Sequence, residues 1–422
     1  MKILIKSAEI LDRSSPHHHQ KKNVLIENGV ITAIGDDHQE ADKIIEADGA
    51  LLSVGWFDMR ASFCDPGLEH KEDLISGMQA ASAGGFTGVA VLPNTEPIIQ
   101  TKNEIEYVKS KNGQSATDLY PIGAVTRNTK GEEITEMIDL HTAGAVAFSD
   151  GIEPIWHPDV LLKALQYLQK FDGLLITRPV DKLLNNYGVM HEGINSTLLG
   201  MRGMPSLSED LMVSRDLKLL EYAGGRIHFT NISSAASLEL IRQAKQRGLN
   251  VTCDIAAYQL SFDDDALHDF DTNYKVDPPF RDESTNQALM QGLKDGTIDV
   301  IVSSHNPQDE ENKKLEFDLA EFGIISLQTV GANLAALAAN VELDQLVEKV
   351  TVKPREMLGL DLPKIAEHEM ANLTLFDPNK AWQFDHESSF SKSRNSPFYG
   401  QKLKGQVLGV FNQQRYYLNE SV

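Results

Sequence analysis

The sequence predicts an α/β fold, a (β/α)8 barrel of the TIM type carrying a small β-sandwich domain built from both chain ends. Three observations lead to this prediction. The chain has 422 residues, which suits one decorated barrel. Its middle alternates eight short β-rich apolar runs with amphipathic helical stretches, the pattern of parallel strands joined by crossovers. Its first fifty residues and its last fifty or so read instead as strands.

The elements follow in chain order. Residues 1–10 alternate between apolar and polar, and residues 24–34 contain Asn28 and Gly29, a hairpin signal. The eight barrel strands are expected at residues 56–59, 87–92, 119–125, 145–148, 174–177, 227–230, 250–253 and 300–303. Helical patterns between them include residues 71–83, 158–169, 210–222 and 234–246. Strands return at residues 373–376, 406–411 and 415–418. We therefore expect a small β domain of residues 1–53 and 366–422 and a barrel of residues 54–365.

The composition narrows the range of partners and compartments. Lysine and arginine number 39 against 61 aspartates and glutamates, a net charge of −22. Such an acidic chain is a poor partner for nucleic acid or an anionic membrane. The two cysteines, Cys64 and Cys253, form no disulfide framework and suit a reducing cytoplasm. Because the sequence shows no signal peptide and no apolar run of membrane-spanning length, we expect a cytoplasmic protein.

A run of three histidines, His17, His18 and His19, suggests a metal site at first sight. Three adjacent side chains in a loop do not easily converge on one ion. The expected structure is therefore a polar loop between two strands.

Motifs spread over almost the whole chain resemble the dihydroorotase family. That family's signature reads Gly-x-x-Asp-x-His-x-His-x-Arg-Glu-Pro-Gly, and Gly55, Asp58, Pro66 and Gly67 stand at matching positions. Further matching runs lie within residues 71–97, 188–205, 277–281, 317–323 and 391–400. The resemblance implies a barrel of the metal-dependent hydrolase type with a small β domain made from both termini. It also implies an enzyme of pyrimidine biosynthesis that interconverts carbamoyl aspartate and dihydroorotate with two metal ions, usually zinc.

The residues at the family's metal-ligand and catalytic positions are replaced in this chain. Arginine has no lone pair and stays protonated, while hydroxyls and amides are poor zinc ligands. We therefore expect no metal, no other cofactor and no catalytic residue. Asp150 alone could remain from the carboxylate site. The replacements are Arg60 and Ser62 for the paired histidines, Arg178 and Asn231 for two later histidines, Ser304 for the catalytic aspartate, Gln308 for a further histidine, and Tyr258 and Gln259 for another histidine pair.

The family's substrate contacts are only partly present. Asn94 matches an asparagine that helps to hold the substrate carboxylate, but it could equally cap the turn before Pro97, so both roles stay open. Cys64 stands in place of an arginine and is expected to be a buried, inert thiol. Asp277 stands in place of an asparagine and would repel an anionic substrate.

The two arginines allow two interpretations. Arg60 and Arg178 could pair with buried aspartates such as Asp58, Asp65 or Asp150, because buried charges must be partnered. They could instead form a site for a small anion. The remaining histidines, His228 and His305, are expected to be packed and hydrogen-bonded.

The resemblance thus implies a dihydroorotase-like protein that is catalytically inactive and acts by assembly with aspartate carbamoyltransferase, by self-association as a homodimer, or by both. The alternative is an active dihydroorotase or related cyclic amidohydrolase with an atypical zinc site supplied by Asp150, His228, His305 or another subunit. A third interpretation is a metal-free protein that binds a small anion in the altered pocket.

Overall fold

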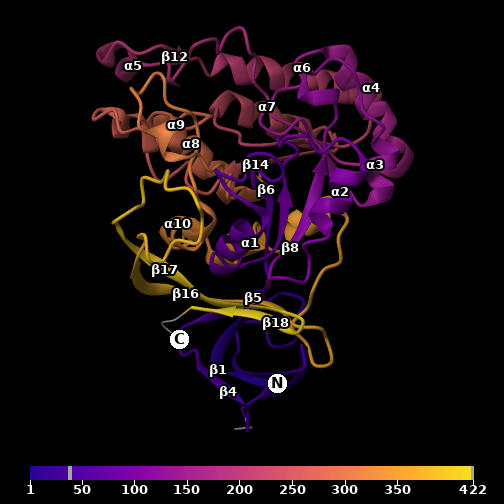
Figure 1. Cartoon of the computed structure of the whole chain (residues 1–422), viewed down its shortest axis with the longest axis vertical. Helices are drawn as coiled ribbons and strands as arrows, with labels where there is room; N and C mark the ends of the chain where they lie inside the picture. The colour runs from indigo at the N-terminus through magenta and orange to yellow at the C-terminus, as the bar shows by residue number, and fades with distance from the viewer. Residues whose placement is uncertain (37–39, 420–422) are drawn as a thin grey trace.

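Two eight-stranded sheets form the framework of the protein in a computed structural model that describes residues 1–36 and 40–419. One sheet curves into a barrel, and the other lies beneath it and contains both ends of the chain (Figure 1). No helix in these described ranges is long and apolar enough to cross a membrane.

The barrel contains all eight predicted strands, each paired in parallel with its neighbour in chain order. An isolated parallel bridge from Ala61 to His305 brings the last strand against the first and closes the barrel. The predicted barrel is therefore confirmed. The strands are β6 (Trp56–Ala61), β7 (Phe86–Val91), β8 (Asp118–Gly123), β9 (Ala147–Phe148), β10 (Leu175–Thr177), β13 (Ile227–Phe229), β14 (Val251–Ala256) and β15 (Val300–Val302).

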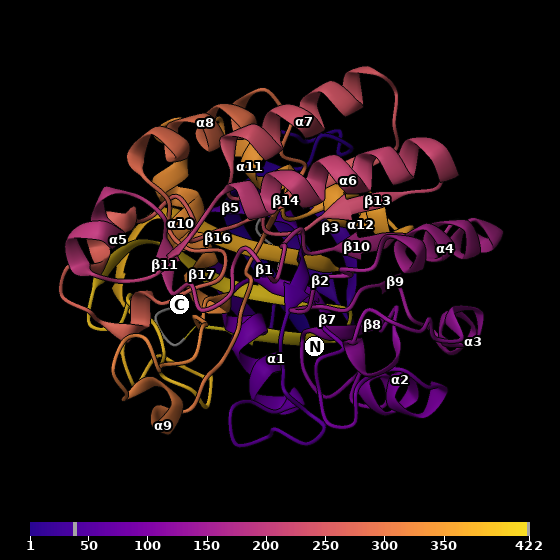
Figure 2. The same cartoon turned by 90° about the horizontal axis from the view of Figure 1, so that it is seen from above.

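Helices surround these strands, as seen from above in Figure 2. A side-chain cap fixes the start of α1, the helix after β6. The carboxylate of Asp73 accepts hydrogen bonds from the backbone N–H groups of Ile75 and Ser76. The four predicted helices correspond to α1, α4, α6 and α7. The helices are α1 (Leu74–Ala83), α2 (Lys102–Lys109), α3 (Met137–Ala143), α4 (Pro158–Leu168), α5 (Ile194–Leu199), α6 (Leu207–Ala223), α7 (Ala235–Gln246), α8 (Glu283–Lys294), α9 (Glu310–Lys313), α10 (Val330–Leu337), α11 (Leu343–Glu348) and α12 (Val352–Leu358).

The second sheet joins the two termini. Its central contact is the antiparallel pairing of β5 with β16, in which Val54 faces Leu373. This shared sheet is as expected, and the domain boundaries themselves stay a prediction. Its strands are β1 (Lys2–Leu11), β2 (Lys21–Glu27), β3 (Val30–Gly35), β4 (Lys43–Glu46), β5 (Leu51–Val54), β16 (Asn372–Gln383), β17 (Lys402–Asn412) and β18 (Arg415–Leu418).

Apolar side chains fill part of the interior and leave one end of the barrel polar. Phe57, Met59, Ile122, Ile176 and Val302 are buried in one cluster that involves six of the barrel strands. Polar residues are instead found where the strands end, which is the place where barrels of this kind carry their sites. A further small sheet of β11 (Met190–His191) and β12 (Gly203–Met204), which the sequence did not predict, lies in the long connection between β10 and α6.

Candidate functional site at the barrel mouth

A cavity of about 210 Å³ opens where the barrel strands end. Arg60 comes from β6, Ser62 follows it, Arg178 follows β10, and Ser304 follows β15. Asn231 follows β13 and donates from Nδ2 to Ser304 Oγ at 2.8 Å. The structure therefore brings together the five positions that the sequence singled out, because the carboxyl ends of parallel strands meet at one rim.

Arg178 forms an ion pair with Asp277 at this rim. Its side chain is 11% exposed and that of Asp277 is 21% exposed, and it also donates to the carbonyl of Ile152. The prediction that this arginine pairs with an aspartate such as Asp58, Asp65 or Asp150 is therefore wrong. Asp277 lies 99 residues along the chain from Arg178. The ion pair neutralises the carboxylate of Asp277, which was expected from the sequence to repel an anionic substrate.

Arg60 is buried without such a partner. Its side chain donates to the carbonyl of Gly151 at 3.3 Å, and within the described ranges no carboxylate oxygen lies within 4.0 Å of its guanidinium. Burial lowers the pKa of Arg60 to about 10, while the charge of Asp254 opposes this shift. Even with this shift, the guanidinium is a cation at neutral pH.

The nearby aspartates are held by backbone and hydroxyl groups. Asp58 accepts from the backbone N–H groups of Ser303 at 3.0 Å and Arg60 at 3.2 Å, and burial raises its pKa to about 7. Asp150 accepts from the backbone N–H and hydroxyl of Thr126, and burial raises its pKa to about 6. Both carboxyls thus fix the ends of barrel strands and are costly to ionise.

The two histidines kept from family motifs are packed and hydrogen-bonded, as expected. The ring of His228 lies between Asp254, at 2.9 Å, and the hydroxyl of Thr252, at 2.8 Å. His305 accepts at Nδ1 from the backbone of Ser326 at 3.1 Å, and its Nε2 lies 3.4 Å from Glu72. Glu72 is fully buried beside this histidine. It lies in a run that matches the family, but no role was predicted for it from the sequence.

Asn94 holds a turn at the edge of the cavity. Its Nδ2 donates to the carbonyl of Asp150 at 3.0 Å, and its Oδ1 accepts from the backbone of Ile152 at 2.9 Å. Because both ends of the amide bind the loop at residues 150–152, the side chain of Asn94 does not cap the turn before Pro97, and its role toward a substrate stays a prediction. Cys64 is buried, and burial raises the pKa of its thiol to about 12, which agrees with an inert thiol.

Gln308 also has structural partners, since it accepts from Lys71 Nζ at 2.8 Å and donates to the carbonyl of Phe322 at 3.0 Å.

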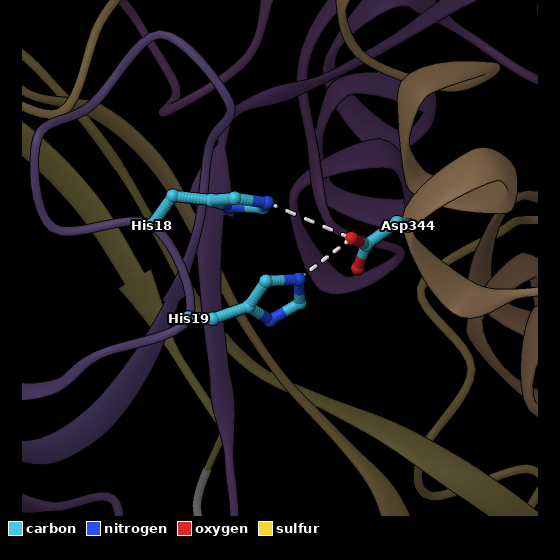
Figure 3. A group of neighbouring side chains, drawn as sticks. All are labelled: His18, His19 and Asp344. Atoms are coloured by element: carbon cyan, nitrogen blue, oxygen red, sulfur yellow. Dashed lines mark hydrogen bonds and ion pairs between the residues drawn. The ribbon is translucent and has the colours of Figure 1, made fainter.

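The described part of the chain contains one group of three or more histidine, cysteine, aspartate or glutamate side chains with ligand atoms within 4.8 Å of one another. It consists of His18, His19 and Asp344 (Figure 3), and none of the three lines this cavity. The histidine run does form a loop between two strands, as predicted. The three rings do not converge, because His17 faces Gln20, but His18 and His19 both face Asp344.

Comparisons with known proteins agree with this architecture. A family model described as "Dihydro-orotase-like" matches residues 49–237. The chain is 39% identical over 409 residues to a dihydroorotase of Pelotomaculum thermopropionicum, and 38% identical over 410 residues to one of Acetivibrio thermocellus, covering 96% of each chain in both cases. Among solved structures, an L-hydantoinase (dihydropyrimidinase) from Arthrobacter aurescens is similar with a TM-score of 0.84 at 21% identity, covering 99% of this chain and 96% of that one. A D-hydantoinase (dihydropyrimidinase) from a Thermus species is similar with a TM-score of 0.82 at 19% identity, covering 100% and 96%. At such identities these structures bear on the fold alone.

Proposed function

The chain belongs to the dihydroorotase family, and from this premise we propose that it is a non-catalytic member that acts by assembly with aspartate carbamoyltransferase. At the level of the family, the relatives support a place in pyrimidine biosynthesis. The finer proposal is that this cytoplasmic protein contributes to making UMP through contact with another enzyme, not through turnover of its own.

The proposal rests on which side chains stand at the ends of the barrel strands, where the family resemblance places the metal ligands. A two-metal centre needs imidazole and carboxylate ligands around a water or hydroxide. Arg60 and Arg178 offer no lone pair there, and their positive charge disfavours a divalent cation. Asn231 and Ser304 hydrogen-bond to each other. These residues do not fit a pair of metal ions, so we derive no catalytic step through them.

The groups that could move a proton are also engaged elsewhere. Ser304 stands where the family has its aspartate, and a neutral serine hydroxyl is a weak base at neutral pH. Asp254 binds His228 and accepts from the backbone of Asn231 at 2.6 Å. Asp150, the one candidate remnant of the carboxylate site, is held by Thr126. This arrangement supports a site without general acid–base chemistry.

A contact surface is suggested by exposed apolar side chains between β10 and α6. Ile194 and Leu198 are 79% and 71% exposed and lie one helical turn apart on α5. Leu183 and Tyr187, in the preceding connection, are 86% and 70% exposed. Exposed apolar side chains gathered in one segment are typical of protein interaction sites. We propose this segment as the surface that contacts aspartate carbamoyltransferase.

Co-expression with the aspartate carbamoyltransferase of the same organism tests the assembly. We expect the two proteins to co-elute in size-exclusion chromatography at a defined stoichiometry. The double variant Ile194→Asp with Leu198→Asp should separate them, whereas Ile138→Asp, at a 39% exposed position on α3, should not. Separate elution of the wild-type proteins at micromolar concentrations, or elution of this chain only as a homodimer, would contradict the proposal.

The names of the relatives favour a second candidate, an active dihydroorotase with an unusual zinc site. Its ligands would have to include Asp150, His228 or His305, each of which already has a protein partner. This candidate predicts metal-dependent turnover, which the first one excludes.

A further inference from the structure

Three side chains from distant parts of the sequence meet on the face where the terminal sheet contacts the barrel. His18 and His19 come from the loop between β1 and β2, and Asp344 comes from the first turn of α11 (Figure 3). His18 Nε2 lies 3.6 Å from Asp344 Oδ2, and His19 Nε2 lies 2.8 Å from the same oxygen. The two imidazole rings are 4.0 Å apart between centroids. All three are partly exposed, so an ion could reach them from solvent.

The loop that carries the histidines is fastened to its surroundings. Ser15 Oγ donates to the carbonyl of Ile365 at 2.6 Å, and the backbone of His19 donates to the carbonyl of Ile10 at 2.8 Å. His19 has a left-handed backbone, with φ of 59°. This turn of the backbone explains how two consecutive side chains can face the same carboxylate, which ordinary extended backbone would not allow.

The donor set is that of a zinc site with open positions. Two imidazole nitrogens and one carboxylate oxygen are ordinary zinc ligands, and water can complete the coordination. In a tetrahedral site with bonds of about 2.0 Å, ligand atoms lie about 3.3 Å apart. The observed separations of 2.8 Å and 3.6 Å lie on either side of this value. The three ligand atoms all lie within 4.8 Å of one another, so side-chain rotation would complete the approach to an ion.

A second carboxylate supports the same assignment. His19 Nδ1 lies 3.1 Å from Glu9 Oε1. Histidines that bind metals usually donate their other ring N–H to a carboxylate, which fixes the tautomer and directs the free lone pair at the ion. Glu9 can play this part for His19, which leaves Nε2 facing Asp344.

We propose that His18, His19 and Asp344 form a binding site for one divalent transition-metal ion of the zinc type. The bound ion would connect the loop of the terminal sheet to helix α11 of the barrel across 325 residues of sequence. The site is independent of the function proposed above, because its residues do not line the cavity at the barrel mouth. In the absence of an ion, a protonated His19 would instead bridge Glu9 and Asp344, and the experiment below separates these two states.

Isothermal titration of Zn²⁺ into full-length, untagged, EDTA-treated protein tests the proposal. We expect one ion per chain and a higher unfolding temperature in its presence. His18→Ala and Asp344→Asn should each weaken binding by more than about tenfold, and Glu9→Gln by about tenfold. His17→Ala is the matched control, since its ring faces Gln20 instead, at 3.3 Å, and this variant should bind as the wild type does.

Three outcomes would overturn the proposal. The first is the absence of zinc binding at micromolar concentrations. The second is binding that His18→Ala and Asp344→Asn leave unchanged. The third is an equal loss in His17→Ala, which would indicate unspecific binding to a histidine-rich loop. Circular dichroism of each variant without zinc distinguishes a lost site from a lost fold.

Discussion

Arg178 and Asp277 face each other at the rim of the cavity, both largely withdrawn from water. Removing one member of such a pair leaves the other as an uncompensated charge, which costs more than the pair itself contributes. We therefore expect Arg178→Met to lower the free energy of unfolding by about 3 kcal/mol. The double variant Arg178→Met with Asp277→Asn should recover most of this loss.

Urea unfolding of the single and double variants measures this coupling. Lys182→Met is the control, because the Lys182–Glu153 pair is 44% and 41% exposed and should contribute less than about 1 kcal/mol. A single Arg178→Met variant as stable as the wild type would contradict the ion pair.

Asp58 makes stability depend on pH. Its folded pKa of about 7 is above the unfolded value of about 3.9. Between these values the folded state holds a proton that the unfolded state has lost, so the free energy of unfolding falls as pH rises from about 4 to about 7. The full effect is at most about 4 kcal/mol.

Asp58→Asn should keep the fold, because its amide can accept from the two backbone N–H groups and donate to Ser303 Oγ. We expect this variant to lose less stability than the wild type between pH 5 and pH 8, as measured by urea unfolding. The exposed Asp159→Asn variant should retain the wild-type dependence. Equal pH dependences in Asp58→Asn and the wild type would show that this carboxyl is not the source.

At the residue scale, the sequence placed the site but not its contacts. The motif positions located Arg60, Arg178 and Ser304 at the rim because strand ends converge in any such barrel. The resemblance placed Asp277 at the substrate site, but nothing in the sequence indicated that its carboxylate would pair with Arg178. The contact between His19 and Asp344 could not be predicted either. The two residues lie far apart in the sequence, and the contact depends on the left-handed backbone of His19.

Among the elements, the barrel strands were the most predictable, because buried parallel strands form short apolar runs bounded by polar residues. The two-residue strands β11 and β12 were missed because such short segments carry no periodicity. The helices α2, α3 and α8 were not singled out either. The elements that position the site were therefore predicted better than the loops that cover it.

The turn between β9 and α4 has little room for a side chain. Gly151 has φ of 67°, and a Cβ added there would lie 1.8 Å from Asn94 Oδ1. Gly200 has the same φ but open space around it. We expect Gly200→Ala to cost about 1 kcal/mol from backbone strain alone. Gly151→Ala should cost at least about 2 kcal/mol, since it also breaks the hydrogen bonds of Asn94.

Thermal unfolding of the two alanine variants distinguishes these contributions. Equal losses of stability would mean that Asn94 does not hold the turn as the structure has it.

The molecule as a whole has the family's framework, but residues at the carboxyl ends of its barrel strands differ from the family pattern. The terminal sheet is tied to the barrel by pairs such as Arg415 with Asp118, at 2.7 Å and 2.9 Å. This framework matches relatives along nearly the whole chain, while the positions that the family resemblance assigns to the metal ligands and the catalytic aspartate carry arginine, serine and asparagine. These replacements on a retained framework are the basis for proposing a partner-dependent role.

Dihydroorotase turnover by the purified protein tests that claim most directly. It should be measured in both directions, with and without zinc, manganese or cobalt, and in parallel with the His18→Ala variant. That variant removes the proposed zinc site on the other face, so zinc binding there is not mistaken for a catalytic metal. We expect no turnover above background under any of these conditions. Metal-dependent turnover that follows the protein through purification and persists in His18→Ala would contradict the account and place working ligands at the barrel mouth.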